Sequence, residues 1–334
     1  MSAIRRILFA IRNPGATRQP GMAKAIQVAR ACGATLELFH AINDPLFVGL
    51  ARSEENDVDA LRERVENEAR IPLVRLCELA RKHGVPATSS VEWDYPPHEA
   101  IVRRAARIDA DLIIAECHQG ARTRPWLMHL TDWELLRTSP LPVLLLKNTR
   151  PWHRPLVLAA VDPAHQHAKP SELDTRIVNA AAEIADRLKG KLHLMHANCP
   201  NILGPSVQNA SRKAANSWST FSFEELKQQE LQVFEAFRAA AGVPRRRAHV
   251  ADGSPAVEIP RVAGELHTDL VVMGAVSRSG LERVFIGNTA ERILDTLQCD
   301  VLVVKPAKFA ARVARESRGL RVVAPSTVAP PLVA

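Results

Sequence analysis

The feature that most constrains this 334-residue chain is an internal repeat. From Gly84 onward, the first half aligns with the second half without a gap at an offset of 158 residues, since Gly84 recurs as Gly242 and Lys147 as Lys305. A pattern that occurs twice in one chain indicates two copies of one structural unit. The same residue type also recurs 158 positions later for Pro97, Ile101, Arg103, Asp111, Leu112, Thr131, Leu136, Thr138, Val143 and Leu144.

Each copy alternates strand-like and helix-like segments. In the second copy, the apolar run 270–273 is followed by a loop of small residues, and a helical pattern then begins near Gly287. A last apolar run, 301–304, ends at Lys305. Strand, helix and strand in this order predict an α/β fold built as two tandem doubly wound domains. In such sheets, ligands bind beyond the carboxyl ends of the strands.

The repeat also predicts the domain boundaries. We assign residues 1–150 to the first domain, 151–308 to the second, and 309–334 to a basic tail that contains proline. Residues 307–334 hold five basic residues and one acidic residue, so this segment carries +4 of the chain's net charge of +8. We interpret this segment as a solvated basic end, and nucleic-acid binding is the weaker alternative.

The composition favours a cytoplasmic globular protein. Hydrophobic residues make up 46% of the chain and aromatic residues only 4%, which predicts an aliphatic core. Apolar runs fall well short of the roughly 20 residues that span a membrane, so no membrane partner is expected. The apolar run near the N-terminus is interpreted as a first strand rather than a signal peptide. Five scattered cysteines indicate a reducing compartment.

A long amphipathic helix is expected over residues 57–83. Pro72 lies inside it and predicts a kink or a break, because proline removes one helical hydrogen bond. The apolar stripe of this helix is predicted to face the core, and it comprises Val58, Leu61, Val65, Leu73, Leu76 and Leu79.

Several short motifs resemble those of one known family. The chain resembles the universal stress protein family in its tandem, two-domain form, and its first half resembles the E-type members. This resemblance implies an adenine nucleotide alpha hydrolase-like fold, in which each domain has a mainly parallel five-stranded sheet with helices on both faces. It also implies that the two domains pair within one chain or that a homodimer forms. The motifs lie at residues 97–101, 117–119, 131–136, 269–274, 287–291 and 299–306.

The resemblance also implies a nucleotide site in the second copy. In nucleotide-binding members, an aspartate that ends the first strand holds the adenine, and Asp162 matches it. A loop with the pattern Gly, two residues, Gly, nine residues, Gly, then Ser or Thr holds the phosphates. The matching positions here are Gly274, Ser277, Gly287 and Asn288, so the second and fourth positions depart from the pattern.

Neighbouring residues supply compensating chemistry. Thr289 offers a hydroxyl one position after Asn288, and Arg278 offers a cation able to grip a phosphate. Met273 precedes the loop. We therefore expect ATP, accompanied by Mg²⁺, as the cofactor of the second domain alone. A tight structural turn that has lost its ligand is the alternative.

The first copy departs further from the pattern. Glu116 stands at the position of Gly274, and Asn13 replaces Asp162. A carboxylate beside the expected phosphate position repels an anion. The sequence therefore predicts that the first domain binds no nucleotide.

These observations favour a stress-response protein that binds a small-molecule ligand and has no catalytic residues. The fingerprints of P-loop, dinucleotide and serine-hydrolase sites are absent. A slow ATPase and a scaffold for a non-nucleotide ligand remain as alternatives. Weaker alternatives are a catalytic pair at Cys117-His118 and metal ligation by His165 and His167 or by His196 and Cys199.

Overall fold

The structure is a computed structural model of the whole chain. The residues that it describes are 4–44, 46–47, 55–117, 125–148, 150–164, 172–198, 220–274, 288–307, 309 and 313–323.

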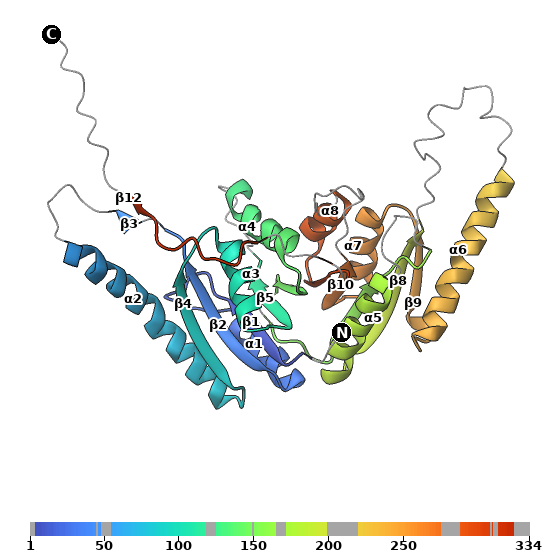
Figure 1. Ribbon diagram of the computed structural model, residues 1–334. Coiled ribbons are helices and arrows are strands. Elements are labelled where there is room, and N and C mark those ends of the chain that lie inside the picture. The colour runs from blue at the N-terminus through green and yellow to red at the C-terminus, as the bar shows by residue number, and fades with distance from the viewer. Residues whose placement is uncertain are drawn as a thin grey trace, which may run out of the picture.

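Ten described strands form one continuous sheet in the order β4-β2-β1-β5-β6-β11-β10-β7-β8-β9 (Figure 1). All pairings within each half are parallel, so the predicted pair of parallel five-stranded sheets is confirmed. The first half contains β1 (Arg6–Ala10), β2 (Thr35–Ile42), β4 (Ala87–Trp93), β5 (Leu112–Glu116) and β6 (Val143–Leu146). The second contains β7 (Leu156–Ala160), β8 (Lys191–Asn198), β9 (Ala248–Asp252), β10 (Leu270–Gly274) and β11 (Asp300–Val304).

The two halves join through their last strands. β6 pairs with β11 in the antiparallel direction, and Leu144 lies opposite Leu302. These two leucines are equivalent at the 158-residue offset, so the repeat meets itself across a local twofold arrangement. The domains therefore pair within one chain, as the resemblance implied.

Helices cover both faces of the sheet. One face carries α1 (Met22–Cys32), α2 (Glu55–Lys82), α5 (Glu172–Arg187) and α6 (Thr220–Ala240). The other carries α3 (Pro97–Arg107), α4 (Pro125–Thr138), α7 (Pro255–Glu265) and α8 (Asn288–Thr296). The apolar core on each face runs through both domains without a break. Burial of this shared apolar surface stabilises the two halves as one body.

Two equivalent lysines cross the junction in opposite directions. The ammonium of Lys147 donates to the carbonyls of Leu294 and Leu297 at the end of α8, and that of Lys305 donates to the carbonyl of Leu136 in α4. Cations are favourable near the carbonyl end of a helix. Burial lowers the pKa of Lys305 to about 8.

A buried carboxylate completes the junction. Asp300 in β11 forms an ion pair with Lys24 of α1, and both side chains are 0% exposed. It also accepts hydrogen bonds from the indole of Trp152 at 2.9 Å and from the backbone N–H groups of Lys147 at 2.7 Å and Asn148 at 2.9 Å. One carboxylate thus connects the first domain, the segment between the domains and the second domain.

The helix α2 runs through Pro72 without a break, and the expected apolar stripe is correct only in part. The predicted Leu73, Leu76 and Val65 pack on buried clusters, together with Cys77 and Ala80. The predicted Leu61 and Leu79 are instead 37% and 41% exposed. Packing of the buried residues on the sheet holds the helix together where proline removes one backbone hydrogen bond.

The C-terminal segment also departs from expectation, because it is not simply a solvated end. Its strand β12 (Val322–Val323) pairs with β3 (Leu46–Phe47), so the chain returns from the second domain to the first. Figure 1 shows this red segment running beside β3 and β4. Arg318 and Arg321 contact side chains or backbone of the first domain.

A pair of histidines predicts acid sensitivity of the outer strands β8 and β9. His193 Nδ1 lies 3.0 Å from His249 Nε2, so one nitrogen donates and the other accepts. Burial, followed by the charges of His249, Arg247 and Lys191, lowers the pKa of His193 from 6.5 to about 4, and burial lowers that of His249. Arg247 ends the short 3₁₀ helix η1 (Arg245–Arg247) just before β9.

The unfolded chain binds protons more readily at these two histidines than the folded chain does. Their contribution to the free energy of unfolding is therefore complete above pH 6.5 and is lost as the pH falls toward 4. We expect the urea midpoint to fall between pH 7 and pH 5, and to fall less in His193→Phe. His267→Asn, at an exposed histidine, is the control. Equal pH profiles for His193→Phe and the wild type would contradict this account.

None of the helices in the described part of the chain is both long enough and apolar enough to cross a membrane.

Candidate functional site

The candidate site lies at the carboxyl edge of the second domain. Asp162 follows β7, and Met273 and Gly274 end β10, which is the neighbouring strand. Asn288 and Thr289 begin α8, so the first backbone N–H groups of this helix have no partners within it. Ser277, Arg278 and Gly287 lie outside the described residues.

The backbone of Asp162 is hydrogen bonded, whereas its carboxylate accepts no hydrogen bond from the described residues. Its N–H donates to Asp174 at the start of α5 over 3.0 Å. Both carboxylate oxygens are buried, and neither has a hydrogen-bond partner among the described residues. A buried acceptor without a donor costs about 1–3 kcal/mol. Such a group marks a place where a ligand with N–H donors gains free energy.

His196, in β8, lies beside the carboxylate of Asp162. Its Nδ1 lies 3.2 Å from the carbonyl oxygen of Val161 and 4.0 Å from Asp162 Oδ1. The nearby carbonyl requires a proton on Nδ1, so this nitrogen is a donor. Phe234 of α6 stacks on the imidazole with ring centroids 5.6 Å apart. The histidine is therefore fixed in one orientation beside Asp162.

Two further acceptors lie near this group. Asn198 is 1% exposed and donates to Asp252 over 3.2 Å, while its own oxygen has no partner in the described part of the chain. The same holds for one carboxylate oxygen of Glu230 on α6. Burial and the charge of Asp162 raise the pKa of Glu230. The base of the site thus contains several acceptors that need donors.

Gly274 has a packing role of its own. A Cβ at this position would lie 2.7 Å from Leu173 Cδ2 and 3.2 Å from Ile177 Cδ1. A Cβ here would force the side chains of Leu173 and Ile177 to shift, so the close approach of α5 to the end of β10 favours glycine whether or not a phosphate binds. Met273 is 5% exposed and belongs to the core on the α7 and α8 face, so only its backbone can face a ligand.

The equivalent edge of the first domain carries a carboxylate of the protein itself. Glu116 occupies the position of Gly274, and its carboxylate accepts the N–H of Gly21 over 2.5 Å at the start of α1. Helix N-termini attract anions, so the protein supplies its own carboxylate there. The oxygens of Asn13 accept hydrogen bonds from Gly15 and Gln19 within the same loop.

Cysteine chemistry is disfavoured at Cys117. Burial and the charge of Asp132 raise the pKa of this thiol to about 11, whereas nucleophilic cysteines have lowered pKa values. His118, His165, His167 and Cys199 lie outside the described residues. Within the described residues, no group of three potential metal ligands occurs.

Comparison with known proteins identifies the family. The model of the universal stress protein family matches residues 3–147 and again residues 157–305. The chain belongs to the universal stress protein family. It carries two tandem domains of this family, and the order of its strands agrees with that assignment.

Individual relatives span nearly the whole chain. Universal stress protein E of Escherichia coli K12 is 27% identical over 304 residues, which is 90% of this chain and 94% of that protein. The crystal structure of a candidate universal stress protein from Pseudomonas aeruginosa UCBPP-PA14 is 28% identical, covers 91% of this chain and 94% of that one, and has a TM-score of 0.69. A functionally unknown protein from Pseudomonas aeruginosa PAO1 is 27% identical, with coverages of 91% and 93% and a TM-score of 0.67.

Sequence reasoning missed two residues of the site, Asn198 and Glu230. Asn198 is the last residue of β8, which pairs with β7. Ligands bind at the carboxyl ends of parallel strands, so a strand predicted to end at Asn198 would have placed this residue among the site candidates. Glu230 has no such signal, because its position depends on how α6 packs over β8.

Proposed function

We propose that this universal stress protein acts in the cytosol as a stress-response protein that binds ATP, with Mg²⁺, in its second domain only. The observation that carries the proposal is the buried carboxylate of Asp162, whose oxygens lack donors among the described residues. The exocyclic amine of adenine supplies N–H donors of the required kind. The start of α8 supplies backbone N–H groups for phosphate oxygens.

The first domain supports the restriction to one site. Its Glu116 carboxylate stands at the position of Gly274, beside the expected phosphate position, and repels an anion there. Binding without efficient turnover is part of this proposal, and the described base of the site supplies hydrogen-bond acceptors, on Asp162, Asn198 and Glu230, for a ligand's donors.

Thermal unfolding with ATP and Mg²⁺ tests the proposal. Ligand at 100 times its dissociation constant stabilises the wild type by about 2.7 kcal/mol. Asp162→Ala removes a buried acceptor that has no donor, so we expect the ligand-free variant to be more stable by about 1 kcal/mol and its ATP response to vanish.

Asn13→Ala, at the matching position of the first domain, is the control and should keep the full ATP response. A response that survives in Asp162→Ala would place the nucleotide elsewhere.

A further inference from the structure

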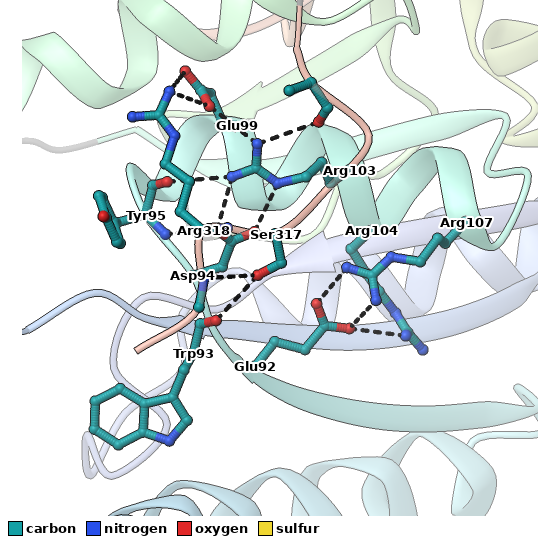
Figure 2. Close-up of polar contacts among 12 residues, drawn as sticks. Glu92, Trp93, Asp94, Tyr95, Glu99, Arg103, Arg104, Arg107, Ser317 and Arg318 are labelled. Atoms are coloured by element: carbon teal, nitrogen blue, oxygen red, sulfur yellow. Dashed lines mark hydrogen bonds and ion pairs between the residues drawn. The ribbon is translucent and has the colours of Figure 1, made fainter. Parts of the chain in front are cut away.

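Residues 313–323, which we call the strap, bind the first domain although they follow the second domain in the chain. The strap lies across the ends of β2 and β4 and the start of α3, as Figure 2 shows for its polar contacts. Ser317 donates to the carbonyl of Trp93 over 3.3 Å, and Arg321 donates to the carbonyl of Asn43 over 2.8 Å. The strap thus reaches the edge where ligands of parallel sheets bind.

Arg318 is the polar anchor of the strap. Its guanidinium donates to both carboxylate oxygens of Glu99, at 3.0 and 2.9 Å, and its backbone N–H donates to Asp94 over 2.9 Å. Both bonds come from one nitrogen, Nη2, and hydrogen bonds between charged groups are stronger than those between neutral groups. Recognition therefore depends on both the side chain and the backbone of this residue.

An aromatic ring and an apolar pocket hold the rest of the strap. The guanidinium of Arg321 lies 4.5 Å from the ring centroid of Tyr95, a favourable cation–π distance. Leu320 packs against the cluster of Ile42 and Trp93. Between the two arginines, Gly319 has a positive φ of 68°, a conformation that favours glycine. Arg318, Leu320 and Arg321 thus each contact the receptor, and Gly319 permits the backbone turn between them.

The receptor is fixed by bonds that do not involve the strap. Asp94 and Arg103 form a two-pronged ion pair at 2.7 and 2.8 Å, and their side chains are 0% and 1% exposed. Arg103 also pairs with Glu99 at 3.0 Å, which orients the carboxylate that Arg318 binds. A receptor whose polar groups are already ordered loses little entropy when it binds a peptide.

The second domain has no such receptor. At the offset of 158 residues, Tyr95 is replaced by Gly253 and Glu99 by Val257. Arg261, the counterpart of Arg103, is exposed and pairs with glutamates of its own helix. The acidic and aromatic receptor is therefore particular to the first domain.

We propose that the end of the first domain formed by β2, β4 and α3 is a recognition site for an extended peptide with the pattern Arg-Gly-Leu-Arg, and that the strap occupies it as an intramolecular ligand. Attachment to the same chain gives the strap an effective concentration in the millimolar range. A free peptide gains access only when the strap is weakened.

Fluorescence anisotropy with a dye-labelled peptide of residues 313–323 tests this inference on the full chain. The double variant Arg318→Ala/Arg321→Ala keeps the receptor and weakens the strap, so we expect it to bind the peptide at least tenfold more tightly than the wild type does. Arg315→Ala, at an exposed strap arginine, is the matched control and should behave as the wild type. Adding Glu99→Gln to the double variant should reduce binding at least tenfold.

Hydrogen exchange gives an independent readout. In the double variant, the amides of Arg318 and Gly319 should exchange at least tenfold faster, while those of β5 and β6 stay protected. The proposal would be overturned if the wild type and the double variant bound the peptide equally tightly. It would also be overturned if Glu99→Gln left the peptide affinity unchanged, or if amide exchange in the strap did not change.

Discussion

Replacing Asp300 with alanine is expected to lower the free energy of unfolding by about 3–5 kcal/mol. The change leaves the ammonium of Lys24 buried without a counter-ion, because both side chains are 0% exposed. It also removes the acceptor for the indole of Trp152 and for the N–H groups of Lys147 and Asn148. Urea unfolding followed by circular dichroism measures the loss.

Two variants rank the contributions to this effect. Lys24→Met should cost less than Asp300→Ala, because Asp300 keeps three N–H donors. Asp295→Ala, at an exposed aspartate of the same domain, should change the free energy by no more than about 0.5 kcal/mol. A cost below about 1 kcal/mol for Asp300→Ala would mean that the carboxylate does not hold the domains together.

Asp94→Ala is expected to cost about 3–5 kcal/mol as well, and in addition to release the strap. Burial opposes the charge on Asp94, yet hydrogen bonds from Arg103 and the N–H groups of Arg318 and Tyr95 hold its pKa below the ordinary 3.8. Removal of the carboxylate leaves Arg103 buried with Glu99 as its remaining acidic partner. Urea unfolding measures the cost, and hydrogen exchange of residues 317–323 reports release of the strap.

The repeat supplies a matched control for Asp94. Asp252 occupies the equivalent position at the end of β9, but its side chain is 63% exposed and pairs with Lys227. Exposed ion pairs contribute up to about 1 kcal/mol and a hydrogen bond such as that from Asn198 about 0.5–1.5 kcal/mol, so Asp252→Ala should cost less than Asp94→Ala. Similar costs for the two alanine variants would contradict the distinct role assigned to the buried pair.

Most of the fold follows from local patterns. The runs that became β5, β6, β10 and β11 are continuous and apolar because these strands are buried on both faces, and the offset between Lys147 and Lys305 carries over to the structure. The path of α2 through Pro72 was not predictable in this way, since it depends on packing against the sheet. The strap was misread for a similar reason, because its arginines find partners more than 200 residues away.

The candidate site likewise contains residues that the sequence identified and residues that depend on tertiary packing. Asp162 and Gly274 were identified through the resemblance to the universal stress protein family, and the structure places them near the ends of the neighbouring strands β7 and β10. The tight packing of Leu173 against Gly274 was hidden, since a glycine favoured by packing and one needed for a phosphate look alike in sequence. Glu230 was hidden because it reaches the site from α6.

Native mass spectrometry of the full chain with ATP and Mg²⁺ tests the central claim, that the doubled fold keeps one ligand site, most directly. The account predicts one nucleotide per chain for the wild type and for Asn13→Ala, and none for Asp162→Ala. Two nucleotides per chain, or one that persists in Asp162→Ala, would contradict it.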